Sequence, residues 1–204
     1  LTPVAVGTKA SGDTVAFATP GKISYVPASG HTNIYHAVEE WYPDASISEL
    51  NTDVQVASAD ITIPGSGNAK VEFGFTGLNQ SKDTAVYFTA PTAESNTNAL
   101  TSASGVLMVN STAMAVITTL SMKIDGKVQA ADGVVGSNVR PDVFRGKVMV
   151  TGSFTCYFEG GTVPDLFRDE TSTSIVAVLT DGLTSAADFV TITLPQVDLN
   201  SSTP

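Results

Sequence analysis

Residues 147–159 alternate between apolar and polar side chains, and this alternation constrains the fold more than any other part of the chain. The even positions are Val148, Val150, Gly152, Phe154, Cys156 and Phe158, and the odd positions are Lys147, Met149, Thr151, Ser153, Thr155, Tyr157 and Glu159. Successive side chains of a β-strand point to opposite faces. The segment therefore predicts a long strand that buries one face and turns the other toward water or a polar wall.

A second alternating segment precedes it, and an unusually long connection separates the two. Met114, Val116, Leu120, Met122 and Ile124 share one face, opposite Ala115, Thr119, Ser121 and Lys123. The connection over residues 125–146 exceeds the roughly two to five residues of an ordinary hairpin loop. Loops of that length are usually functional or disordered, so we expect this connection to do more than join two strands.

The first half of the chain contains another strand pair. Asp53–Ile63 is strand-like, but its apolar positions change from even to odd, which predicts a bulge near Ser58. Pro64–Asn68 is a strong turn signal, and Ala69–Gly77 then alternates cleanly. Residues Ile34–Tyr42 fit either a helix or a strand, and their period does not decide between them.

A short helix and two closing strands are expected after residue 159. Pro164–Asp169 suits a helix with Pro164 at its first position, where the missing N–H costs nothing. Ser174–Leu179 and Phe189–Leu194 read as strands. The sequence therefore predicts an all-β fold with one short helix.

The two halves of the chain echo each other. In each, a long strand is followed by a turn or loop and by a strand opening with a small residue, Lys and Val. We predict two similar β units, residues 1–100 and 101–204, although chance in a β-rich sequence also explains the echo. The second unit holds the connection 125–146 and the helix near 164–169. Because the chain starts at Leu1 rather than Met, we treat the first unit as incomplete at its N-terminus.

The charge balance argues against a nucleic-acid-gripping protein. The chain of 204 residues has 20 acidic and 10 basic residues, a formal net charge of −10. A protein that binds DNA tightly normally has more basic than acidic residues, because Lys and Arg neutralise the phosphates. The acidity suits a surface past which DNA slides without sticking, but on charge alone the favoured interpretation is a soluble protein that its own charge keeps dispersed.

No site for chemistry emerges from the sequence. His31 and His36 match no common zinc spacing, and Gly65-Ser66-Gly67 leads into a strand rather than a phosphate-binding helix. The lone Cys156 cannot form an intrachain disulfide. The apolar runs are too short and interrupted to span a membrane. We predict no catalytic, cofactor-binding or metal-binding residue, no membrane association and no enzyme activity.

A series of structural motifs occurs in a characteristic order. A strand ends in Lys-Ile-Asp-Gly, then come a Val-Val-Gly-Ser-Asn connection, an Arg-Gly pair, the strand "VTGSFTCYFEG" and a helix ending near Asp169-Glu170-Thr171. The earlier "YHAVEEWYPDASISEL" segment and the strand end Gly-Phe-Thr-Gly belong to the same pattern. Over most of residues 31–181 the chain resembles the tail tube proteins of bacteriophages with long, non-contractile tails.

This resemblance implies a tail-tube-type β-sandwich whose long strands join neighbouring subunits into a ring-shaped inner barrel. It implies a structural virion protein, assembled in the bacterial host cytoplasm, whose stacked rings guide DNA into the host without binding it specifically. The partners it implies are further copies of the chain, as six-fold rings or pseudo-six-fold trimers, together with tape measure and tail-end proteins.

The resemblance also assigns two sets of residues. Candidates for contacts between subunits or rings are Val134, Val135, Asn138, Val139, Arg140, Pro141, Asp142, Phe144 and Arg145. Candidates for the lumen face are Lys147, Thr151, Ser153, Thr155 and Glu159. The alternative is an extracellular carbohydrate-binding or adhesin-like β-sandwich, which composition alone supports almost as well. Such a module usually exposes clustered aromatics, whereas the aromatics here occupy mainly the predicted apolar faces.

Overall fold

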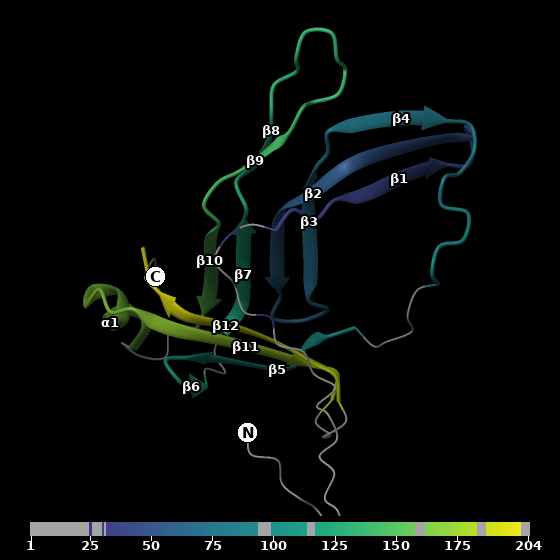
Figure 1. Ribbon diagram of the computed structural model, residues 1–204. Coiled ribbons are helices and arrows are strands. Elements are labelled where there is room, and N and C mark those ends of the chain that lie inside the picture. The colour runs from purple at the N-terminus through teal and green to yellow at the C-terminus, as the bar shows by residue number, and fades with distance from the viewer. Residues whose placement is uncertain are drawn as a thin grey trace, which may run out of the picture. The chain divides into compact units, whose positions relative to one another are not determined.

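A computed structural model of the chain describes Tyr25, Gly30 and residues 32–93, 99–113, 117–157, 162–182 and 187–200 (Figure 1). The chain divides into two compact units, residues 1–32 and 33–204, and every strand and helix that the structure describes lies in the second. This unit consists mostly of strands with one short helix, which confirms the all-β prediction.

The elements follow one another along the chain as a succession of strands interrupted once by a helix. The strands are β1 (His36–Tyr42), β2 (Ile47–Ile63), β3 (Lys70–Thr76), β4 (Asn79–Asp83), β5 (Thr101–Val109), β6 (Thr112–Ala113), β7 (Ile117–Asp125), β8 (Val128–Ala130), β9 (Val143–Arg145), β10 (Met149–Cys156), β11 (Thr173–Thr180) and β12 (Phe189–Val197). The helix α1 spans Thr162–Arg168. It begins earlier than predicted, so Pro164 lies within its first turn rather than at its first position.

The longest strand, β2, organises the first sheet. Its N-terminal half pairs with β1 and β4, and its C-terminal half pairs with β7 and β3, all antiparallel. Strand β10 adds to β7. Strands β3 and β4 follow one another along β2, so together they form one long hairpin with it (Figure 1). We call β3-β2-β7-β10 the proximal sheet and β1-β2-β4 the extension.

Midway along its length, β2 changes which of its side chains face the core. Its register with β3 shifts between Val56 and Ser58, leaving Ala57 as the extra residue, and this confirms the predicted bulge. Because the side-chain period of a strand is two, one extra residue reverses the alternation. After the bulge the odd-numbered residues Ile61 and Ile63 face the interior.

A second sheet covers the apolar face of the proximal sheet. Its strand order is β12-β11-β5-β6, and β11 alternates between buried and half-buried residues along its whole length. Residues of both sheets line one interior: Ile61, Ile63, Leu120, Met122, Ile175, Ala177, Ile192 and Leu194. Removing apolar surface from water stabilises a fold by roughly 25 cal/mol per Å², so this interior is the core of a β-sandwich.

Some strands are not predicted by the sequence. The first half of β5 is made of small residues without alternation, β4 is entirely polar, and β8 and β9 are too short to show a period. Residues Ile34–Tyr42 fit a helix or a strand by sequence, and His36–Tyr42 among them form β1. The division into units 1–100 and 101–204 stays a prediction. Strands from both of these ranges, β2 and β7, pair within the proximal sheet.

One carboxylate fixes the segment after β4 to the extension. Glu39 of β1 accepts hydrogen bonds from the Ser48 hydroxyl and from the backbone N–H groups of Tyr87 at 2.6 Å and Phe88 at 2.9 Å. These donors, the Ser48 hydroxyl foremost, hold the pKa of Glu39 below its usual value. The charged carboxylate thus supplies partners for two backbone groups of an otherwise irregular segment.

Shortening Leu120 tests which face of β7 lies in the core. Leu120 is 8% exposed, so Leu120→Ala should lower the free energy of unfolding by about 2–5 kcal/mol through lost burial and the cavity left behind. The neighbouring Thr119 lies on the opposite, exposed face, and Thr119→Ala should change that free energy by less than about 0.5 kcal/mol. Urea unfolding of both variants measures the difference, and equal effects would contradict the assignment of the two faces.

Candidate functional site

The face of the proximal sheet opposite the core is polar on all four strands, except for Met149, which pairs with Asp125 at one end of β10. Cross-strand pairing places Glu72, Asp60, Lys123 and Thr151 in one row, Lys70, Thr62, Ser121 and Ser153 in the next, and Thr119 beside Thr155. Directly paired residues of antiparallel strands point to the same face. These residues therefore form one continuous surface, which we call the polar face.

Hydroxyl groups dominate the β7–β10 half of the polar face. The Oγ atoms of Ser121 and Ser153 lie 2.9 Å apart and share a hydrogen bond between the two strands. Of the predicted lumen-facing residues, Thr151, Ser153 and Thr155 lie on this face, Lys147 is exposed just before β10, and Glu159 falls outside the described residues. The alternation in the sequence thus identifies the polar side of β10.

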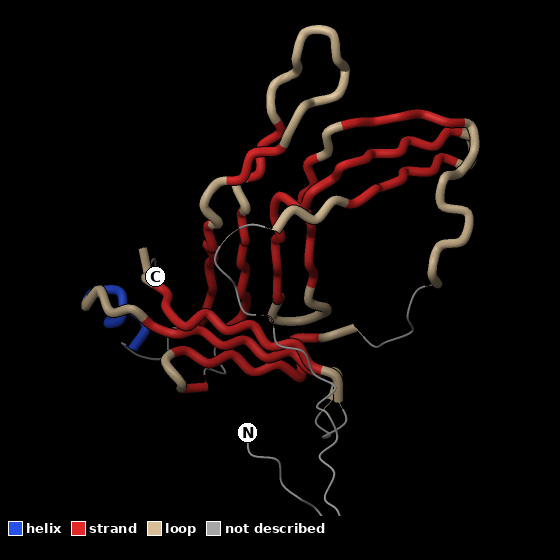
Figure 2. Tube along the Cα trace, in the orientation of Figure 1, coloured by secondary structure: helices blue, strands red, loops and turns tan. Residues whose placement is uncertain are grey.

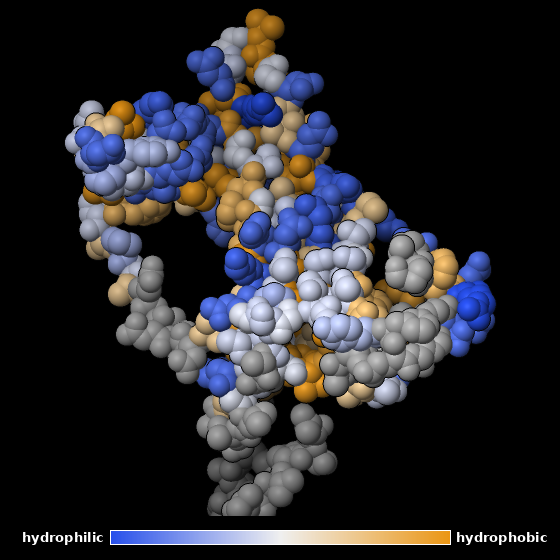
Figure 3. All heavy atoms as spheres, turned by 180° about the vertical axis from the view of Figure 1, so that it is seen from behind, coloured by the Kyte–Doolittle hydropathy of each residue, from blue (hydrophilic) through white to orange (hydrophobic). Residues whose placement is uncertain are grey.

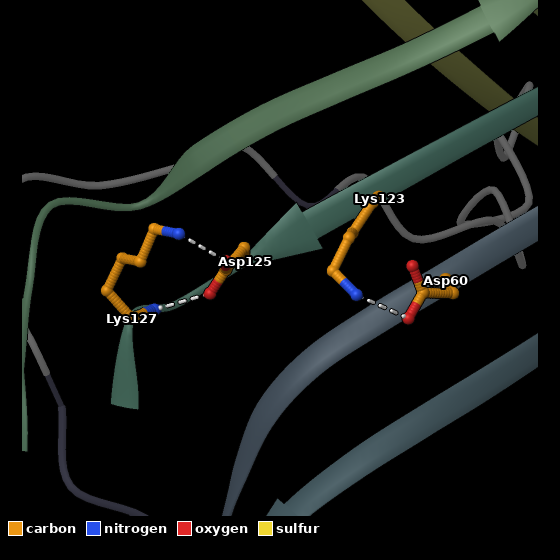
Figure 4. Close-up of polar contacts among 4 residues, drawn as sticks. All are labelled: Asp60, Lys123, Asp125 and Lys127. Carbon is orange, nitrogen blue, oxygen red and sulfur yellow. Dashed lines mark hydrogen bonds and ion pairs between the residues drawn. The ribbon is translucent and has the colours of Figure 1, made fainter. Parts of the chain in front are cut away.

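Two ion pairs lie near the centre and the end of the polar face (Figure 4). Lys123 Nζ lies 3.1 Å from Asp60 Oδ2, across the pairing of β7 with β2. Lys127 Nζ lies 2.7 Å from Asp125 Oδ2, and the Lys127 N–H donates to Asp125 Oδ1 at 2.8 Å. The Lys127 ammonium group first, and then its N–H, hold the pKa of Asp125 below the usual value.

Sequence reasoning missed the role of Asp60. Its partner Lys123 lies 63 residues away, and only the register between β2 and β7 brings the two together. The bulge at Ala57 is the sequence signal that could have found it, because the change of alternation puts Asp60 on the polar side of β2.

The connection 125–146 forms a projecting arm with a paired base. Strands β8 and β9 pair, and the Ala131 N–H donates to the Asp142 carbonyl at 2.9 Å, which closes the base of the loop (Figure 2). The Gly126 N–H donates to the carbonyl of the bulged Ala57 at 2.9 Å. The arm is thus tied to β2 at its root.

Arg145 anchors the base of this arm. Its guanidinium donates two hydrogen bonds to Oε1 of Gln55, the one from Nε measuring 2.8 Å. Gln55 is 1% exposed, and a buried amide left without a partner costs about 1–3 kcal/mol. Arg145 therefore supports the fold, in contrast to the predicted contact residues that lie farther out.

The outer part of the arm exposes both apolar and polar side chains. The exposed members of the predicted contact set are Val134, Val135, Asn138, Val139, Arg140, Pro141, Asp142 and Phe144. Hydrophobic atoms stand at the outermost end of the arm, at the top of the view in Figure 3. Val135 is fully exposed, and Val134 and Val139 are 49% and 40% exposed. Phe144 is 62% exposed but lies on β9, at the base of the arm. Exposed apolar groups clustered in this way are typical of a surface that contacts another protein.

The proximal sheet ends in two unpaired strand edges. Among the strands that the structure describes, β3 pairs only with β2, and β10 pairs only with β7. Both edge strands also expose apolar side chains, namely Val71, Phe73 and Phe75 on β3 and Val150 on β10. An open, apolar strand edge is a template for pairing with another chain.

The described residues show neither a metal-ligand cluster nor a membrane-spanning helix. Within the described ranges, no group of three or more His, Cys, Asp or Glu side chains is arranged as metal ligands would be. In the part of the chain that the structure describes, no helix is long and apolar enough to cross a membrane.

Comparison with known proteins assigns the family. A family model described as phage tail tube protein matches residues 2–201, nearly the whole chain. The chain belongs to the phage tail tube family. A search of curated proteins finds no match.

The family assignment confirms the structural role predicted from the sequence. As a phage tail tube protein, the chain is a structural component of the virion tail and assembles with itself and other tail proteins into a tube. The assignment gives no support to the alternative of a carbohydrate-binding or adhesin-like module.

The titration of Asp125 tests the contacts at the root of the arm. A lowered pKa means that Asp125 stabilises the fold fully above the unfolded value of about 3.9, and that this contribution is lost as the pH falls through the lower folded value. Removing the ammonium group by Lys127→Ala should move the pKa of Asp125 back toward about 3.9. NMR titration of the side-chain carboxyl measures it. Lys82→Ala, which breaks an ion pair with Glu49 on the extension, should leave it unchanged, and an unmoved pKa in Lys127→Ala would contradict the assignment.

Proposed function

We propose that six copies of this tail tube protein join edge to edge into a ring whose inner wall is the polar face. Stacked rings then form the conduit through which DNA passes into the host without specific binding. The observation that carries this proposal is the pair of open edges, β3 and β10, on opposite sides of a sheet with one polar face.

The directions of the strands support a head-to-tail contact. All neighbours in the order β3-β2-β7-β10 are antiparallel, so β3 and β10 run in opposite directions. When β10 of one copy lies beside β3 of the next, the new pair is antiparallel as well. Such a heterologous contact forms a ring if its rotation closes, and the closed barrel then has no open edge.

The number of strands favours six copies over three. Each copy contributes the four strands of the proximal sheet, so three copies would close a barrel of about 12 strands and six copies one of about 24. Barrels of about 8 strands are filled by side chains, while those of roughly 16 hold an aqueous channel. A lumen wide enough for a DNA duplex therefore needs the larger ring.

The remaining surfaces suit contacts with other proteins of the tail. The arm, with Val134, Val135 and Val139 exposed, is positioned to contact a neighbouring copy in the same ring or the next one. Tape measure protein inside the tube and tail-end proteins complete the set of partners. Assembly takes place in the host cytoplasm, and the chain has no enzymatic activity.

A charge placed on the β3 edge tests the contact between subunits. Val71 pairs with the core-facing Ile61 but is 50% exposed, because it lies on the edge strand, so Val71→Lys should leave the single subunit folded. It should prevent tubes, because the lysine would be buried against the neighbouring copy. Val106 of β5 is 49% exposed on the other sheet, and Val106→Lys serves as the matched control that still forms tubes. Negative-stain electron microscopy of the purified proteins gives the result.

Two outcomes would count against this arrangement. Wild-type protein that stays monomeric at high concentration would contradict assembly of the chain by itself. Normal tubes from Val71→Lys would show that the β3 edge does not lie between subunits.

Shortening the arm tests its role separately from the fold. Replacing residues 134–139 with Asn-Gly keeps the paired base and the Arg145–Gln55 contact, so the free energy of unfolding should change by less than about 1 kcal/mol. We expect this variant to fold but to form no tubes. Urea unfolding and electron microscopy measure the two properties, and normal tubes would mean that the arm makes no essential contact.

A further inference from the structure

The polar face carries almost none of the negative charge of the chain. Its acidic residues in the proximal sheet are Asp60, Glu72 and Asp125, and its basic residues are Lys70 and Lys123. Three acids against two lysines leave one negative charge, compared with ten for the whole chain. The extension, by contrast, holds six acids and one lysine between residues 36–54 and 79–83, and hydrophilic residues cover much of its surface in Figure 3.

Lys123 occupies the middle of this nearly neutral surface. It lies on β7, an inner strand, with Asp60 directly across on β2 and the uncharged Thr151 across on β10. Two residues along β7, Asp125 is engaged by Lys127. The acid in contact with the Lys123 ammonium group is therefore Asp60, at 3.1 Å (Figure 4).

The Asp60–Lys123 pair has little to do with stability. The side chains are 41% and 49% exposed, and ion pairs with that exposure contribute little to the free energy of folding. The pair does decide how much positive charge the centre of the face presents to a polyanion. A lysine with a carboxylate 3.1 Å away is already neutralised, whereas a free lysine binds phosphate and releases counterions.

We propose that Asp60 determines how weakly the tube wall interacts with DNA, by neutralising Lys123. This inference rests on the proposed function, in which the polar face lines the lumen. Without Asp60, a ring of six copies would present six ammonium groups at one height around the DNA, each with only the more distant charge of Asp125, which Lys127 already engages, to offset it. Each phosphate that they neutralise would make the slope of log binding constant against log salt concentration more negative by about 0.9.

The experiment uses tubes assembled from full-length protein and a short fluorescent DNA duplex. The variants compared are wild type, Asp60→Asn and the double variant Asp60→Asn/Lys123→Gln. After nuclease treatment, cosedimentation measures the protected DNA that the tubes retain at a series of salt concentrations. We expect Asp60→Asn to retain more DNA than wild type and to show a salt slope steeper by about 0.9 per phosphate engaged. The double variant should return to the wild-type value.

A matched control comes from the extension. Glu49→Gln frees Lys82 from an ion pair of 2.7 Å outside the polar face, and should leave the retention of protected DNA unchanged. Equal increases in Glu49→Gln and Asp60→Asn would assign the effect to general surface charge and overturn the inference.

Other outcomes separate the inference from the proposed function. Tubes of Asp60→Asn with a normal central hole and wild-type DNA retention would overturn the role of Asp60 and leave the tube arrangement standing. If Asp60→Asn does not assemble, Thr151→Lys adds an unneutralised lysine to the same row, and unchanged retention in that variant would overturn the inference. Failure of the wild-type protein to form tubes would contradict the proposed function itself.

Discussion

The arrangement of the sheet depends on one irregularity in its longest strand. The extra residue Ala57 reverses the alternation of β2, so that Ile61 and Ile63 face the core while Asp60 and Thr62 lie on the polar face. The same residue offers its carbonyl to Gly126 at the root of the arm. Without this bulge the charged side of β2 would point into the sandwich, where an unpaired charge is strongly unfavourable. The bulge at Ala57 thus determines both which side chains of β2 lie on the polar face and where the arm is attached.

Much of this architecture could be predicted from the sequence, because it rests on alternation. The polar side of β10, the strands β3, β11 and β12, the bulge near Ser58 and the short helix all have local signals. Other features have no local signal in the sequence. The all-polar β4 is a strand because β2 offers it an edge, and the Arg145–Gln55 contact joins residues 90 apart. Pairings of this kind depend on long-range register, which a local pattern does not contain.

Charge is distributed unevenly between the extension and the proximal sheet. Acidic residues gather on the extension, where carboxylates such as Glu39 also serve as hydrogen-bond acceptors for irregular backbone. The proximal sheet instead uses hydroxyl side chains and compensated ion pairs. A net charge of −10 therefore describes the chain as a whole and not the surface on which the proposed function depends. The composition predicted that the chain has no basic surface for binding DNA. It did not predict which surface would be nearly neutral.

The root of the arm and the turn at Pro64–Asn68 lie at opposite ends of the proximal sheet, since the end of β7 pairs near the bulge and its start pairs near Ile63. In a ring built by repeated head-to-tail addition, every copy has the same orientation. All arms would then leave from one rim and all turns from the other. A stack of such rings has a direction, with two chemically different ends. Proteins that initiate the tail and proteins that terminate it would meet different surfaces, although both ends are built from the same chain.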